Sequence, residues 1–268
     1  MNDFLSALIL GIVEGITEFL PISSTGHLII VNQFVGFTEQ FANMFDVVIQ
    51  LGAILSVVVY FWKRLIPLGF NKSSDNQGIF DLWKKTLVGV IPALGIGFLV
   101  GKYIEELLFN TTVVAIALIV GGLILLYIEN KRPSVRISSI QHLSYKTAFL
   151  IGLIQCLAMI PGTSRSAATI IGAMLLGATR VVAAEFSFFL AIPTMFAASA
   201  YSFFKNSMFL TAHELIVVAC GFFVSFIVAW MVIAGFMNYI SKRDFKPFAY
   251  YRIVLGIFVL IYFGFLQS

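Results

Sequence analysis

Two glutamates lie four residues apart inside a strongly apolar stretch near the start of the chain. Because helix residues four positions apart lie on one face, Glu14 and Glu18 would bring their carboxylates close together. Two carboxylates so placed cannot both ionise in a dry site unless a cation or an arginine lies with them. Their oxygens suit a hard divalent cation, Mg²⁺ or Ca²⁺. The alternative is that one or both are protonated and hydrogen-bond to neighbouring helices.

A proline and a row of hydroxyl groups follow the two glutamates. Pro21 interrupts the helix, because it lacks an N–H and clashes with the preceding turn. Ser23, Ser24 and Thr25 are residue types that cap helix N-termini, which predicts a polar turn and a second helix that begins near Ser23 or Ser24. His27 lies three residues after Ser24, so it could be a base for that hydroxyl or orient a water. Taken separately, Ser24 could be a helix cap, and a single histidine is usually a hydrogen-bonded core residue.

A second polar motif occupies residues 161–169, again within an apolar stretch. Gly162 would let the backbone approach a ligand closely. Thr163 and Ser164 are cap-type residues, so N–H groups at the start of a helix would point at this turn. A helix N-terminus beside the guanidinium of Arg165 forms an anion site, and the geometry of arginine suits phosphate. The alternative is a structural ion pair between Arg165 and a buried glutamate.

Together the two motifs contain the groups that phosphoryl transfer requires. An arginine and helix N-termini bind a phosphate, carboxylates hold a cation that neutralises it, and a hydroxyl or an activated water attacks. The catalytic candidates are Glu18, Ser24, His27 and Arg165, and the metal candidates are Glu14 and Glu18. The remaining groups expected to contact the substrate are Glu14, Ser23, Thr25, Gly162, Thr163, Ser164, Ser166 and Thr169.

The composition of the chain is that of a membrane protein. Apolar residues make up 60% of the sequence, charged residues only 11%, and the mean hydropathy is +0.98. A soluble domain of this size would carry about 25% charged residues. The net charge of +4 does not indicate a nucleic-acid partner. The chain is therefore predicted to be an all-α polytopic protein, with most of its residues in the lipid bilayer.

Six apolar segments are each near the ~20 residues that cross the hydrocarbon core. They cover residues 41–62, 84–104, 111–129, 182–204, 212–238 and 248–266. Two further apolar stretches, 4–36 and 146–177, are each split in the middle by one of the polar turns. Each half is too short to span, which predicts a re-entrant hairpin that other helices enclose.

The two split stretches resemble each other. Residues 11–14 match residues 152–155, and residues 21–24 match residues 161–164 with a shift of one position. The chain is thus predicted to be one integral membrane domain with two repeats, 1–129 and 130–268, each a broken re-entrant hairpin followed by three spans. Because three is odd, the second repeat must be inverted, an arrangement that brings two broken helices together near the midplane.

The basic residues test this topology. Loops 63–85, 130–146, 177–181 and 239–252 fall on one side of the predicted membrane, and positive residues mark the cytoplasmic side. Both termini would then lie outside, and the first hairpin would enter from outside. These four loops carry all lysines and arginines but Lys102, Arg165 and Lys205, namely Lys63, Arg64, Lys72, Lys84, Lys85, Lys131, Arg132, Arg136, Lys146, Arg180, Lys242, Arg243, Lys246 and Arg252.

At these motifs the sequence resembles the undecaprenyl-diphosphate phosphatase family, also known as bacitracin-resistance proteins. The similarity covers essentially the whole chain. Its most specific parts are Glu14-x-x-x-Glu18, the segment 21–27 and the segment 161–169. Further similarity lies in the segment 45–52, where Asp46 stands at a position that is often Glu in relatives.

The resemblance implies a multi-pass enzyme of the bacterial plasma membrane. It would remove the terminal phosphate of undecaprenyl diphosphate, which recycles the lipid carrier of cell-wall synthesis and gives resistance to bacitracin. It also implies dependence on Mg²⁺ or Ca²⁺ and an active site open to the outer face. Carried over by motif, Glu14 and Glu18 would handle metal and substrate, Ser24 would be the nucleophile, His27 its helper and Arg165 the phosphate anchor. Whether Ser24, His27 or a water attacks is left open by the resemblance.

A transporter is the alternative function, because inverted repeats with broken helices are also a transporter architecture. Movement of a polyprenyl phosphate across the bilayer would be its obvious form, and it is compatible with hydrolysis. The residues leave the oligomeric state open, with a homodimer among the options.

Overall fold

The computed structural model describes residues 2–35, 37–67, 73–108, 110–131, 134–205 and 210–266 of the chain. These residues are almost entirely helical, apart from one isolated bridge between Ile137 and Ala178. The elements are α1 (Asp3–Thr17), α2 (Ser24–Val31), α3 (Glu39–Tyr60), α4 (Trp62–Leu65), α5 (Ser73–Leu108), α6 (Thr111–Lys131), η1 (Ile140–His142), α7 (Tyr145–Gln155), η2 (Cys156–Met159), α8 (Arg165–Leu175), α9 (Arg180–Lys205), α10 (Ala212–Ile240) and α11 (Lys246–Leu266).

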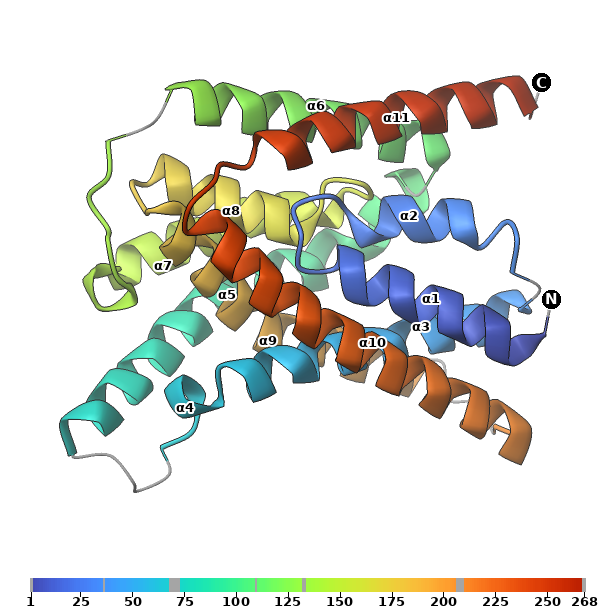
Figure 1. Cartoon of the computed structure of the whole chain (residues 1–268), viewed down its shortest axis with the longest axis horizontal. Helices are drawn as coiled ribbons and strands as arrows, with labels where there is room; N and C mark the ends of the chain where they lie inside the picture. Colours follow the sequence, from blue (N-terminus) through green and yellow to red (C-terminus); the bar gives the residue numbers. More distant parts are fainter. Residues whose placement is uncertain are drawn as a thin grey trace.

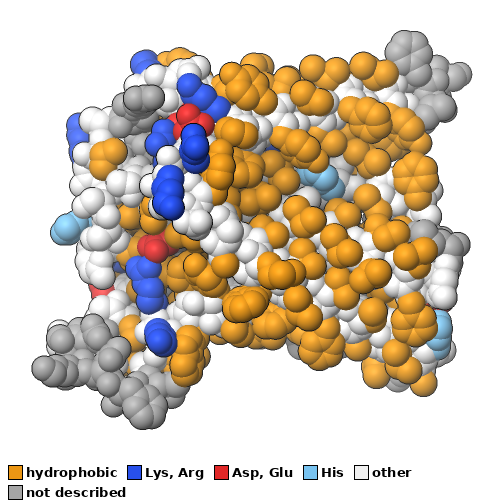
Figure 2. All heavy atoms as spheres, viewed as in Figure 1, with side chains coloured by type: hydrophobic (Ala, Val, Ile, Leu, Met, Phe, Trp, Pro, Cys, Tyr) orange, Lys and Arg blue, Asp and Glu red, His pale blue; other side chains and the backbone are white. Residues whose placement is uncertain are grey.

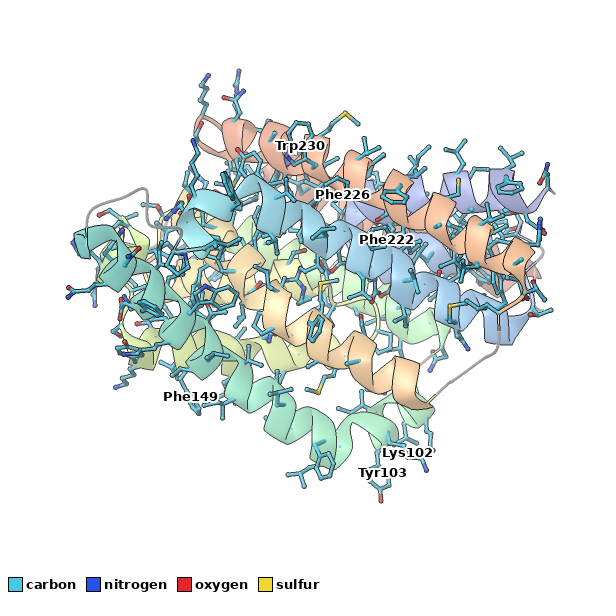
Figure 3. All side chains as sticks on the ribbon, turned by 90° about the horizontal axis from the view of Figure 1, so that it is seen from below. Lys102, Tyr103, Phe149, Phe222, Phe226 and Trp230 are labelled. Atoms are coloured by element: carbon cyan, nitrogen blue, oxygen red, sulfur yellow. The ribbon has the colours of Figure 1, made fainter. Side chains whose placement is uncertain are left out.

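The six predicted spans are confirmed. Helices α3, α5, α6, α9, α10 and α11 are each long and apolar enough to cross a bilayer. In Figure 3, Phe222, Phe226 and Trp230 follow one another along α10 and Phe149 points outward from α7; Trp230 and Phe149 are exposed. Aromatic and aliphatic side chains on such a surface remain in an apolar medium when the protein is inserted.

The predicted loop 63–85 was wrong over most of its length. Helix α5 already begins at Ser73, so Lys84 and Lys85 are helical, and Lys85 is buried. Lys85 pairs with Asp81 at 2.6 Å, one helical turn away, and donates to the carbonyls of residues 140 and 141. Hydropathy marks where a helix enters the bilayer. The helix itself can continue beyond that point, because its backbone hydrogen bonds need no apolar surroundings.

The two polar turns each separate two short helices. The first elbow, residues 18–23, joins α1 to α2, and the second elbow, residues 160–164, follows α7 and η2 and leads into α8. Helix α2 has only 8 residues and α8 only 11. At 1.5 Å per residue neither can cross the ~30 Å hydrocarbon core. In Figure 1 both pairs fold back as hairpins among the longer helices.

Glycines hold each hairpin against a long helix of the other half of the chain. Helix α1 packs on α10, and α7 packs on α5. A Cβ on Gly11 would lie 2.8 Å from the carbonyl oxygen of Gly221, and one on Gly152 would overlap the carbonyl of Gly89. Gly11 and Gly152 are matched positions of the predicted repeats. The matched pairings are consistent with an inverted repeat.

Charge is distributed unevenly along the molecule. Figure 2 shows lysine and arginine side chains gathered at one end, and Figure 1 shows both termini at the opposite end. Lys72 and Arg132 lie outside the described residues, as does the side chain of Lys205. Arg252 is an exception to the prediction, which placed it in a cytoplasmic loop. It lies in α11 and is fully buried.

Candidate active site

The carboxylate of Glu18 joins the two hairpins. Ser24 at the start of α2 donates its hydroxyl hydrogen to Oε2 of Glu18, with 2.7 Å between the oxygens. Arg165 at the start of α8 donates from Nη2 to Oε1 of the same carboxylate at 3.4 Å. Both members of this ion pair are largely buried. The structure therefore brings the two sequence motifs into one site, around a single carboxylate.

Equivalent residues of the two elbows shape this arrangement. Ser23 and Ser164 have φ angles of 72° and 69°, and within the described part of the chain no other residue except glycine has a positive φ. Each caps the helix that follows, since Ser23 accepts from the N–H of Gly26 and Ser164 from the N–H of Ala167. The left-handed backbone costs roughly 1–2 kcal/mol at such a residue, so the surrounding contacts must hold it.

The elbows correct the predicted alignment of the repeats. Sequence matching paired Pro21 with Pro161 and required a shift of one position. The structure instead pairs the caps Ser23 and Ser164, and the same sequence separation relates residues 11–14 to 152–155, so no shift is needed. Ser24 and Arg165 are then equivalent first residues of their helices, and both bind Glu18.

Glu14 is the clearest candidate for a cation ligand. It is fully buried one helical turn before Glu18, and neither of its carboxylate oxygens has a hydrogen-bond partner among the described residues. Its equivalent in the second half is Gln155, which is neutral. Asp46 on α3 also has a buried oxygen without a partner. A divalent cation bound by Glu14 and Glu18 would satisfy the orphaned oxygens of Glu14, so these two glutamates fit the predicted metal.

The described residues contain no group of three or more acidic, histidine or cysteine side chains in an arrangement that would hold a metal by itself. Mg²⁺ often takes only one or two carboxylates from the protein and completes its shell with water and substrate phosphates. Two glutamates are therefore sufficient as the protein's share of such a site.

Hydroxyl groups of α8 connect the arginine to its surroundings. Ser166 donates to the carbonyl of Leu20 in the first elbow at 2.8 Å and lies 3.0 Å from the hydroxyl of Ser164. Thr169 is buried and lies 2.6 Å from the hydroxyl of Ser187 on α9. Arg165 donates from Nη1 to the carbonyl of Ser187 at 3.0 Å. Ser166 and Thr169 thus hold α8 in place around Arg165.

The other predicted contact residues lie around the same elbows. Thr25 follows Ser24 on α2 and is partly exposed, as are Thr163 and Ser164 in the second elbow. Gly162 has a φ of 88°, and a Cβ there would overlap the backbone of Val114 on α6. The close approach that Gly162 permits in the structure is therefore between the second elbow and α6.

His27 does not bind the hydroxyl of Ser24 in the structure. Its Nδ1 donates to the carbonyl of Ser23 at 2.7 Å, and its Nε2 lies 2.7 Å from the hydroxyl of Tyr251 on α11. The two rings are stacked with 5.5 Å between their centroids. Because a carbonyl only accepts, Nδ1 carries a hydrogen, and the neutral ring then accepts at Nε2 from Tyr251.

Sequence reasoning missed Tyr251 and Arg252, which both face the elbows from α11. Nothing in the local pattern distinguishes them, because aromatic and basic residues are common where a span meets the membrane interface. Both residues lie far from His27 and Pro21 along the chain, so their contacts cannot be predicted from local sequence.

An apolar cavity of about 470 Å³ opens beside the first elbow. It is bounded by Val13 and Ile16 of α1, by Leu20 and Ile22 of the elbow, and by Phe248 of α11. His27 and Tyr251 also line it. Figure 2 shows a histidine recessed among hydrophobic side chains on this face. The polar site is therefore adjacent to a space that suits a hydrocarbon chain.

Known proteins are similar to this chain over nearly its whole length. The family model described as "Bacitracin resistance protein BacA" matches residues 7–258. A protein of Limosilactobacillus fermentum named undecaprenyl-diphosphatase is 50% identical over 99% of both chains. Undecaprenyl-diphosphatase 1 of Clostridioides difficile is 52% identical over 97% of this chain and 96% of its own. The undecaprenyl-diphosphatase of Fusobacterium nucleatum is 53% identical over 95% and 98%. The chain belongs to the bacitracin resistance protein BacA family.

Proposed function

We propose that the chain is a membrane phosphatase that hydrolyses undecaprenyl diphosphate to undecaprenyl phosphate and inorganic phosphate. The observation that carries the proposal is the junction of Ser24 and Arg165 on Glu18, which unites a hydroxyl, an acceptor for its proton and a phosphate-binding group. The names of the relatives support this activity over the transporter alternative. The product is the lipid carrier that cell-wall synthesis uses again, and its recovery underlies resistance to bacitracin.

Ser24 is the proposed nucleophile. As its oxygen attacks the terminal phosphorus, Glu18 takes the hydroxyl proton, and the bond between that phosphorus and the bridging oxygen breaks. Undecaprenyl phosphate leaves with the bridging oxygen. Water then attacks the phosphoserine, which releases inorganic phosphate and restores the hydroxyl. Arg165 and the N–H groups at the starts of α2 and α8 neutralise the charge of the transferred phosphoryl group.

Glu14 and Glu18 are the proposed protein ligands of a divalent cation, Mg²⁺ or Ca²⁺. When bound, the cation would supply charge neutralisation to the diphosphate. The buried, unpartnered oxygens of Glu14 support this assignment.

The apolar cavity is proposed to accept the polyprenyl chain next to the diphosphate. Its lining is mostly hydrocarbon, and its polar members are Thr17, His27 and Tyr251. The substrate would enter from the bilayer, since a chain of this length is not soluble in water.

Release of phosphate from undecaprenyl diphosphate tests the proposed function directly. The purified protein in detergent should release phosphate with Mg²⁺ or Ca²⁺, and excess chelator should abolish the release. Restoring the cation after chelation should restore the rate, which separates metal removal from denaturation. Failure of well-folded protein to release phosphate with either ion would contradict the proposal and favour the transporter.

Loss of the Tyr251 hydroxyl should slow the reaction modestly. Tyr251→Phe keeps the ring that stacks on His27 but removes a hydrogen bond worth about 1 kcal/mol, or about fivefold in rate. The measurement is kcat in the phosphate-release assay. Tyr250→Phe is the matched control, because Tyr250 is 57% exposed on the surface of the protein. Equal kcat values for the two variants would show that the hydrogen bond between Tyr251 and His27 does not contribute to the reaction rate.

The charge distribution supports an outward-facing site in the plasma membrane, with the basic end in the cytoplasm and both termini outside. Cysteines at Asn110, between α5 and α6, and at Ser138, between α6 and α7, test this orientation. Cys156 and Cys220 are first replaced by alanine. An impermeant thiol reagent added to intact cells should label the cysteine at 110 and spare the one at 138. The reverse pattern would overturn the proposed orientation.

A further inference from the structure

Arg252 lies between the two elbows and binds both of them. Its Nη1 donates to the carbonyl of Pro21 in the first elbow at 3.4 Å. Its Nη2 donates to the carbonyls of Gly162 and Thr163 in the second elbow at 3.3 and 2.9 Å. The side chain is fully buried. A single guanidinium thus contacts main-chain atoms on both sides of the site.

Helix α6 provides the socket for this guanidinium. Helices α6 and α11 pack along each other (Figure 1), and Arg252 also donates to the carbonyls of Ala117 and Leu118. A Cβ on Gly121 would collide with the guanidinium. Glycine at this position therefore leaves the space that Arg252 needs.

The charge of Arg252 has no acidic partner among the described residues. The ion pairs found there involve other residues, and the partners of Arg252 are all backbone carbonyls. Burial of a charge in a membrane protein is costly, and an apolar side chain would pack the same helices at a lower cost. The guanidinium joins the two elbows and α6 through their carbonyls, which an apolar side chain could not do.

The contacts of Arg252 determine how the second elbow is oriented. A trans peptide directs its N–H away from its C=O. By holding the carbonyl of Thr163, Arg252 fixes the direction of the N–H of Ser164, immediately before α8. The same contacts restrain the positive φ angles of Gly162 and Ser164. The placing of Arg165, the next residue, depends on this backbone.

We propose that Arg252 is a positioning residue that locks the two elbows against each other and so aligns Ser24 and Arg165 around Glu18. The inference rests on the proposed phosphatase function for its kinetic consequence, but its structural part stands on the contacts alone. It concerns alignment and not substrate binding. We call the contacts of Arg252 with Pro21, Gly162 and Thr163 the lock. Loss of these contacts should lower kcat and leave KM nearly unchanged.

Three variants test the lock kinetically. Arg252→Lys keeps the charge, but one ammonium cannot reach carbonyls of both elbows and α6 in the way a guanidinium does. Arg252→Met removes the charge at similar length. Gly121→Ala keeps Arg252 and displaces its guanidinium. Each should lower kcat at least tenfold and change KM less than threefold. Gly235→Ala is the control, because a Cβ there meets open space.

A double variant separates the lock from unrelated damage. If Gly121→Ala acts by moving Arg252, then Arg252→Lys with Gly121→Ala should lose little more activity than either change alone. Fully additive losses would overturn the shared mechanism. If the Arg252 variants fail to fold, the kcat of Gly121→Ala alone tests the proposal, because this variant keeps the positive charge of Arg252.

The reactivity of Cys156 gives a readout that does not need the enzyme activity. Cys156 begins η2, just before the second elbow, and is partly exposed. With Cys220 replaced by alanine, release of the elbow by Arg252→Lys should raise the rate at which Cys156 reacts with a maleimide. An unchanged rate, a kcat within twofold of wild type, or a raised KM with normal kcat would each overturn the proposal. If wild type releases no phosphate, the proposed function fails and the thiol rates still test the lock.

Discussion

Glu18→Gln should lower the rate of phosphate release about a thousandfold. A glutamine side chain can still accept the hydrogen bond from Ser24, but it cannot take the proton when the hydroxyl attacks. General base catalysis contributes about 10²–10⁴-fold to enzymatic rates. The same change removes the negative charge that pairs with Arg165 at 3.4 Å and one of the two proposed cation ligands.

The measurement is kcat under saturating substrate and cation, with the folded fraction established by size-exclusion chromatography and thermal unfolding. Glu106→Gln is the matched control. Glu106 lies on α5, is largely exposed and, among the described residues, forms its ion pair with Lys102 at 3.7 Å. Such a surface pair contributes little to stability. A Glu18→Gln enzyme that keeps more than a tenth of the wild-type rate would show that Glu18 is not the base.

Arg165→Ala should also abolish activity, with a loss of about 10³-fold or more in kcat/KM. An arginine that stabilises phosphoryl transfer typically contributes 10³–10⁵-fold. Arg165→Lys should recover only part of this loss. The guanidinium holds the carbonyl of Ser187 with one nitrogen and Glu18 with the other, and a single ammonium cannot keep both contacts and bind phosphate.

Arg64→Lys is the control for a general effect of weakening an arginine–glutamate pair. Arg64 donates to Glu185 on α9 at 2.6 Å, and among the described residues the side chain of Glu185 has no hydrogen bond to either elbow. Its variant should lose less than threefold in activity. If Arg64→Lys and Arg165→Lys lose similar amounts of activity, Arg165 supports activity by stabilising the fold and not by binding the phosphate.

The two large effects have a common structural cause. Glu18 receives hydrogen bonds from the first residue of α2 and from the first residue of α8, which belong to opposite halves of the chain. Changing the carboxylate therefore disturbs the hydroxyl and the arginine together. We expect the losses from Glu18→Gln and Arg165→Ala to be far from additive in the double variant.

Much of the architecture follows from the sequence. A bilayer requires long apolar helices with internally satisfied backbones, so the six spans can be read from hydropathy. Pro21 and Pro161 show where two apolar stretches must break, and the polar residues beside them identify both halves of the site. Glu18, Ser24 and Arg165 were all among these candidates. Burial of ionisable groups is costly, which is why such residues stand out against an apolar background.

Only the tertiary structure decided which of these groups meet. Hydropathy gives the depth of a helix but not its rotation, so the inward side of α11, with Tyr251 on His27 and Arg252 between the elbows, could not be predicted. For the same reason the acceptor of the Ser24 hydroxyl is Glu18 and not the nearby His27. These contacts join residues that are far apart in the chain or separated by a turn. Their geometry is set by helix packing, down to the space left by Gly121 and Gly162, and not by local sequence.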